Sequence, residues 1–143
     1  MLVTIANGNF ELVLTDYILG ELFEHLWDFP TDRREPALRS VEYLKQATVI
    51  DEKRWTIRFE RAANEVGETK DAPIMAAYLL DEVDVLVTSN VHDFPIEDYE
   101  TILTPREFVE TFGSDEWVIG RGSAASRCVL LCPDRARRIA FGR

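Results

Sequence analysis

Residues 69–94 constrain the fold more than any other part of the chain. Asp71 stands before an apolar segment at 72–80, which predicts a helix. After two acidic residues, the apolar run at 83–87 predicts a short buried strand, and a polar cluster follows it. A helix and a buried strand with polar groups at the strand's carboxyl end are typical of open α/β sheets, whose ligands bind at that edge.

Strands and helices alternate along the rest of the chain. Apolar runs predict strands at 10–14, 48–50 and 99–103, and amphipathic patterns predict helices at 16–27, 33–46, 52–66 and 105–112. This alternation predicts an α/β fold with a mostly parallel sheet. The apolar runs at 117–119 and 128–131 fit no element of that pattern.

The length of 143 residues predicts one domain, and no apolar run approaches the roughly 20 residues of a membrane span. We expect a cytoplasmic protein, because a basic segment before the first apolar residues is missing. The two cysteines, Cys128 and Cys132, are too few for a disulfide scaffold and have no second pair for zinc.

Charge is distributed unevenly along the chain. The net charge is −10, yet residues 121–143 contain six arginines and only one acid, Asp134. We therefore set residues 114–143 apart as a basic C-terminal extension of uncertain order, following a domain at 1–113. The acidic balance argues against binding nucleic acid over the whole surface, whereas the tail could be a phosphate-contacting arm, an intramolecular charge partner or a solvated tail.

Three carboxylates are expected at the carboxyl edge of the sheet: Glu21, Asp71 and Asp93. Oxygen ligands of this kind suit Mg²⁺ or Mn²⁺, and an ion held there can orient water for attack on a phosphodiester. Each residue alone is more readily explained as a helix cap or a solvated side chain, so the hypothesis depends on their joint placement. We find no glycine-rich phosphate loop and no metal-ligand spacing of the histidines.

Four segments, in order, resemble the PIN domain, the nuclease fold of VapC-like toxins. The matching segments are FELVLTDYILGEL at 10–22, DAPIMAA at 71–77, VLVTSNVHDFP at 85–95 and ILTPREF at 102–108. The resemblance covers roughly residues 1–112. It implies a three-layer α/β/α domain.

The resemblance also implies a function: a Mg²⁺- or Mn²⁺-dependent endoribonuclease, the toxin of a toxin–antitoxin pair. Glu21, Asp71 and Asp93 would be catalytic and would bind the metal together with Asn90, with Thr88 and Ser89 in support. The expected partners are an RNA substrate, an antitoxin protein and a second copy of the chain in a homodimer.

Two features depart from the PIN pattern. The family's first strand, which ends in an Asp, has no counterpart at the N-terminus, and Asn90 stands where many members have an Asp. One hypothesis is that residues 127–134 fill the missing strand's place and bring Asp134 to the site. The alternatives are a truncated chain, a catalytically degenerate PIN-like module that acts in binding or assembly, and an unrelated α/β domain.

Overall fold

The computed structural model describes residues 10–25, 28–44, 47–113 and 127–132. Five parallel strands form one sheet in the order β2-β1-β5-β3-β4. The strands are β1 (Phe10–Thr15), β2 (Thr48–Ile50), β3 (Val85–Thr88), β4 (Ile102–Leu103) and β5 (Arg127–Cys132). The predicted α/β class with a mostly parallel sheet is confirmed, since every strand pair in the sheet is parallel. The arrangement is consistent with three α/β/α layers.

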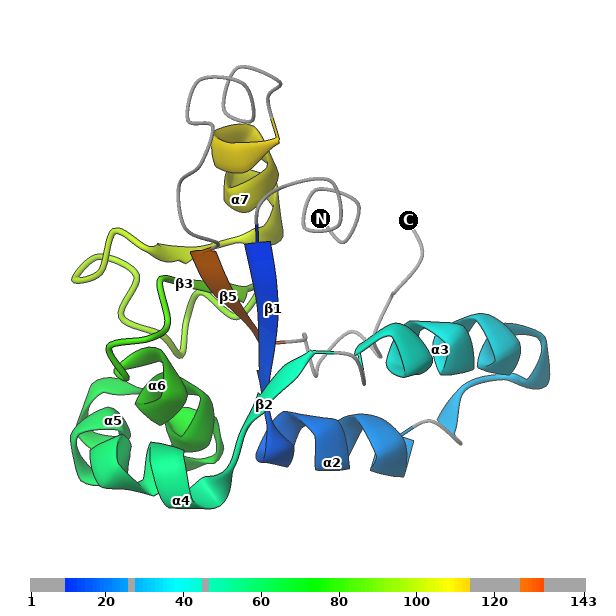
Figure 1. Ribbon diagram of the computed structural model, residues 1–143, viewed down its shortest axis with the longest axis horizontal. Coiled ribbons are helices and arrows are strands. Elements are labelled where there is room, and N and C mark those ends of the chain that lie inside the picture. The colour runs from blue at the N-terminus through cyan, green and yellow to red at the C-terminus, as the bar shows by residue number, and fades with distance from the viewer. Residues whose placement is uncertain (1–9, 26–27, 45–46, 114–126, 133–143) are drawn as a thin grey trace.

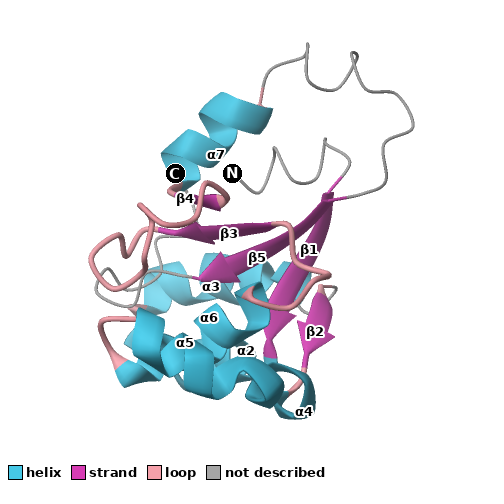
Figure 2. Ribbon diagram, turned by 90° about the vertical axis from the view of Figure 1, so that its left-hand side faces the viewer, coloured by secondary structure: helices cyan, strands magenta, loops and turns pink. Residues whose placement is uncertain are grey.

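Helices lie on both sides of this sheet (Figure 2). They are α2 (Asp16–His25), α3 (Thr31–Leu44), α4 (Glu52–Trp55), α5 (Phe59–Glu65), α6 (Ala72–Tyr78) and α7 (Pro105–Phe112), with 3₁₀ turns η2 (Thr56–Arg58) and η3 (Thr69–Asp71). Helix α7 covers one face, and α4, α5 and α6 gather on the other, while α2 and α3 extend to the side (Figures 1 and 2). None of the helices in the described ranges has the length and apolar character of a membrane span.

Strand β5 occupies the middle of the sheet, between β1 and β3. Val129 and Leu130 on this strand are fully buried, as are the apolar residues of β3 that it pairs with. Continuous apolar runs are expected in parallel strands that are covered on both faces. Residues 127–132 of the hypothesised segment 127–134 do form a strand inside the sheet, whereas its comparison with a PIN strand stays a prediction and Asp134 lies outside the described residues.

The placement of β5 also bears on the predicted domain division. The sequence put residues 114–143 outside the domain, yet residues 127–132 of that segment form its central strand. Residues 114–126 and 133–143, with most of the basic tail, lie outside the described part of the chain.

Local patterns explain most of the element boundaries. The hydroxyl of Thr15 accepts a hydrogen bond from the Ile18 amide, which caps α2. Thr104 and Glu107 form the capping box of α7, whose first residue is the predicted Pro105. The predicted helix at 52–66 is divided into α4, η2 and α5, which follow one another without a break.

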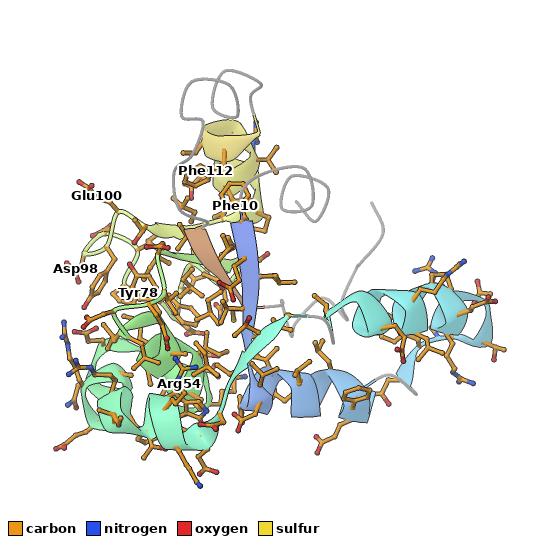
Figure 3. All side chains as sticks on the ribbon, viewed as in Figure 1. Phe10, Arg54, Tyr78, Asp98, Glu100 and Phe112 are labelled. Atoms are coloured by element: carbon orange, nitrogen blue, oxygen red, sulfur yellow. The ribbon has the colours of Figure 1, made fainter. Side chains whose placement is uncertain are left out.

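An aromatic cluster closes the core at the amino edge of the sheet. Phe10 on β1 lies beside Phe112 on α7, with ring centroids 5.5 Å apart (Figure 3), and Phe108 lies between 5.1 and 5.4 Å from these two rings. Ring pairs at these separations add to the stability that burial supplies. The cluster attaches α7 to β1, the neighbour of the central strand.

Replacing Leu130 by alanine should show how far the fold depends on β5. Because Leu130 is fully buried in the central strand, we expect Leu130→Ala to lower the free energy of unfolding by about 2–5 kcal/mol, measured by urea denaturation. The matched control is Val109→Ala, at a partly exposed position of α7, with an expected change of about 0.5 kcal/mol. Similar losses in the two variants would contradict a central place for β5.

Candidate functional site

Three carboxylates meet beside the carboxyl end of β3. One oxygen from each of Glu68, Asp71 and Asp93 lies within 4.8 Å of the other two. Asp71 and Asp93 were predicted site residues, and the structure brings them together. Glu68 was missed because nothing in its sequence pattern marks it: it lies in the turn between α5 and η3.

Asp71 is the most enclosed member of this acidic cluster. It ends η3 and precedes α6, and only 1% of its surface is exposed. Its carboxylate makes no capping hydrogen bond to the helix, which argues against the alternative of a simple helix cap. Burial of a carboxylate is unfavourable unless charge or hydrogen bonds compensate for it, and a bound cation would add to the compensation that the fold supplies.

Asp93 is held in place by the turn that follows β3. The hydroxyl of buried Thr88 accepts a hydrogen bond from the Asn90 amide at 3.0 Å. The side-chain amide of Asn90 then donates to Oδ2 of Asp93 at 2.6 Å. Thr88 therefore holds the turn, and Asn90 orients Asp93 through its side-chain nitrogen, while their predicted roles at a metal ion stay predictions. Ser89 is exposed.

Gly67 joins this turn to the segment that carries Glu68. Its amide donates to the backbone oxygen of Asp93 at 2.8 Å. A Cβ atom on Gly67 would lie 2.8 Å from Oδ1 of Asp93 and 3.2 Å from its Cα. A side chain at position 67 would therefore displace the Asp93 carboxylate and press on its backbone, and glycine permits the close approach of the segments that carry Glu68 and Asp93.

A cation of the protein itself already contacts the cluster. Nζ of Lys70 lies 2.8 Å from Oε2 of Glu68, in a pair whose side chains are about half exposed. Lys70 directly precedes Asp71 in the sequence. The positive charge of Lys70 therefore partly offsets the electrostatic repulsion expected among the three carboxylates of the cluster.

Glu21 does not join the acidic cluster. It lies on α2, partly buried, outside the set of carboxylates that the structure brings together. Asp16, at the start of α2, has a structural role, because its carboxylate accepts hydrogen bonds from the Tyr17 and Glu52 amides and from Nε1 of Trp55. These bonds tie α2 to α4 at the carboxyl edge.

The donor set fits a small divalent cation. Around an octahedral ion with oxygen ligands at about 2.1 Å, two opposite ligand atoms lie about 4.2 Å apart. Adjacent ligands lie about 3.0 Å apart, and at most one pair among three ligands can be opposite. The cluster oxygens, which lie within 4.8 Å of one another, would therefore have to draw closer around a single bound ion. An all-carboxylate set of hard oxygen donors favours Mg²⁺ or Mn²⁺ over softer metals.

A second network holds the far end of the loop that carries Asp93. The Tyr99 hydroxyl donates to Glu65 on α5 at 2.9 Å and accepts a hydrogen bond from Nη2 of Arg61 at 3.1 Å. Its ring meets that of Tyr78 edge-on, with centroids 5.5 Å apart. Burial, followed by the hydrogen bond to Glu65, raises the pKa of Tyr99 above its usual value. Asp98 and Glu100 extend outward from the same loop (Figure 3).

Comparisons of the chain with family models, with curated proteins and with solved structures find no match. The PIN resemblance therefore stays a prediction, and the site rests on its geometry.

Gly67→Ala should weaken metal binding at the acidic cluster. The added methyl group would push Asp93 away, so we expect about a ten-fold loss in Mn²⁺ affinity, measured by isothermal titration calorimetry. Gly20→Ala is the control, because a Cβ there meets nothing within 4 Å and alanine in a helix gains up to about 1 kcal/mol. Unchanged Mn²⁺ affinity in Gly67→Ala would argue against a metal site here.

The Tyr99 network predicts a loss of stability in alkali. The pKa of Tyr99 is raised in the folded protein, so the unfolded chain loses the phenolic proton first and the free energy of unfolding falls as pH rises through about 10. Tyr99→Phe should remove this share of the pH dependence in urea unfolding between about pH 8 and pH 11. The same slope in both proteins would contradict the assignment.

Proposed function

We propose that this chain is a Mg²⁺- or Mn²⁺-dependent ribonuclease of PIN type that cleaves RNA phosphodiesters. The observation that carries the proposal is the meeting of Glu68, Asp71 and Asp93 at the carboxyl end of a central parallel strand. Open parallel sheets bind their ligands at this edge. The order of the PIN-like segments supports the same class, as does the presence of a further strand, β5, in the middle of the parallel sheet.

Each residue of the site has a separate role in this proposal. Asp71 and Asp93, with Glu68, hold the cation, and Asn90 keeps Asp93 in the orientation to do so. The bound ion supplies an activated water and stabilises negative charge on the phosphate. Thr88 fixes the turn on which this geometry depends.

By the same resemblance, we infer that the protein is the cytoplasmic toxin of a toxin–antitoxin pair. An antitoxin protein and a second copy of the chain are then its expected partners. A homodimer also agrees with the general frequency of symmetric dimers among soluble oligomers.

A second candidate function is a catalytically degenerate PIN-like module that acts in binding or assembly. The ion pair between Lys70 and Glu68 favours it, because a built-in cation lets the carboxylates coexist without a metal. Divalent-metal affinity separates the two functions: a degenerate module binds Mn²⁺ weakly, and its Asp71→Asn variant binds no more weakly than the parent.

Cleavage of a mixed-sequence single-stranded RNA in the presence of Mn²⁺ tests the nuclease directly. We expect Asp71→Asn to lower the rate by a factor of about 100 or more, because it removes the buried negative ligand. Asp98→Asn, on the exposed loop before β4, removes the same charge outside the cluster and should leave the rate unchanged. Metal-independent cleavage, or equal rates in the two variants, would refute the proposal.

Three further substitutions test whether Glu68, Glu21 and Asp134 each contribute to the site. Glu68→Gln should weaken Mn²⁺ binding, because Glu68 belongs to the acidic cluster. Glu21→Gln should lower the rate only if Glu21, which stands outside the cluster, meets the substrate. Asp134→Asn tests the hypothesis that this residue follows β5 into the site. A loss of metal affinity in Asp134→Asn, measured by calorimetry in a folded variant, is the expected result.

A further inference from the structure

The helical segment 53–61 carries a basic outer face in a chain whose net charge is −10. Within 53–61 the chain has Lys53, Arg54, Arg58 and Arg61 and a single acid, Glu60. The opposite, inner face, formed by Trp55, Phe59 and Ala62, packs into the core. The basic side chains, together with Ile57, therefore point outward by the geometry of the helix, and we call them the 53–61 face.

Two of these cations are available to a partner. In the described ranges, the side chains of Lys53 and Arg58 take part in no hydrogen bond and no ion pair, and both residues are exposed. Arg54, by contrast, forms an ion pair with Glu82, and Arg61 contacts Glu65 and Tyr99. Charges that stabilise nothing within the fold are available to bind an anion.

An exposed apolar side chain lies among these cations. Ile57 is 74% exposed, more than any other large apolar residue in the described part of the chain. It lies one helical turn from both Lys53 and Arg61 in sequence. A polyanion that carries apolar groups between its charges fits such a mixture, and a nucleic acid strand, with bases between phosphates, has this chemistry.

The 53–61 face is connected to the acidic cluster through α5. Helix α5 carries Arg61 and ends at Glu65, two residues before Gly67, whose amide donates a hydrogen bond to the backbone oxygen of Asp93. In addition, α4 and α5 lie against α6, which begins next to Asp71 (Figure 1). A strand that crosses the 53–61 face can thus continue toward the cluster.

We propose that the 53–61 face binds the phosphate backbone of single-stranded RNA and guides it to the acidic cluster. Lys53 and Arg58 contact phosphates, and Ile57 contacts the face of a base. The inference rests on the proposed ribonuclease function, for which it names a substrate-binding surface. Contacts to phosphate set position and affinity without selecting a sequence.

The test is the binding of a fluorescein-labelled single-stranded RNA, followed by anisotropy over a range of KCl concentrations in EDTA, which prevents metal-dependent cleavage. We expect the double variant Lys53→Glu/Arg58→Glu to bind at least about ten-fold more weakly. The slope of log K against log salt should become shallower by about 1.4, which corresponds to two lost phosphate contacts on a single strand. Ile57→Ser should weaken binding without changing the slope.

The matched control is Arg33→Glu/Arg39→Glu, which makes the same charge change at two exposed positions of α3. Equal weakening by both double variants would mean that only total charge matters, and would overturn the inference. So would unchanged binding by Lys53→Glu/Arg58→Glu. Displacement of the RNA by poly-L-glutamate at equal charge concentration would assign the face to an acidic protein instead.

The result is separable from that of the nuclease test. Asp71→Asn should bind the RNA as the parent does, because the 53–61 face is intact. Binding that depends on Lys53 and Arg58 in a protein that cleaves nothing would refute the ribonuclease and keep the surface. Cleavage that survives in Lys53→Glu/Arg58→Glu with an unchanged KM would keep the ribonuclease and refute the role of the 53–61 face. Circular dichroism confirms that each variant is folded.

Discussion

The pairing of β5 with both β1 and β3 is the contact on which the rest of the structure depends. Without it, β1 with β2 and β3 with β4 would be two separate pairs, each with an unpaired edge. The register also aligns the strand ends: Leu130 pairs with Val13 and with Leu86, so that Thr15, Cys132 and Thr88 end at the same edge. The acidic cluster lies beside this edge, where the turn after β3 meets the segment that leads into α6.

A few polar contacts then convert that edge into a defined site. The bond from Gly67 to the backbone of Asp93 joins two segments that lie far apart in sequence, and Asn90 fixes the direction of the Asp93 carboxylate. Farther along, Tyr99 fastens the other end of the same loop to α5. Since these contacts come from residues outside the cluster, its geometry is set by the loops as much as by the carboxylates themselves.

Local structure was predictable because it depends on local patterns. Apolar runs and capping residues such as Thr104 identify elements within a few residues, and they gave nearly every strand and helix from Phe10 to Phe112. The position of β5 depends on pairing across more than a hundred residues, which no local pattern records, so the run at 128–131 could be placed only through the missing strand of the PIN pattern.

The residues of the site were predictable where a local pattern marks them, and the prediction failed where no such pattern exists. Asp71 and Asp93 follow from their places at element ends, a helix start and the turn after a strand. Glu68 lies in a turn without any periodic pattern, and its role follows from the close approach at Gly67. Glu21 was placed by the same rule, near the start of a helix that follows a strand, yet it lies outside the cluster.

The balance between Lys70 and a metal ion decides which of the two proposed functions the site can serve. Lys70 contacts Glu68 in a pair whose side chains are 51% and 50% exposed, and pairs of that kind contribute about 1 kcal/mol or less. In the proposed nuclease, a divalent ion would meet three carboxylates at once, one of them buried. Because an exposed ion pair contributes so little, such an ion could displace Lys70 from Glu68, and the proposed nuclease function requires that it does so.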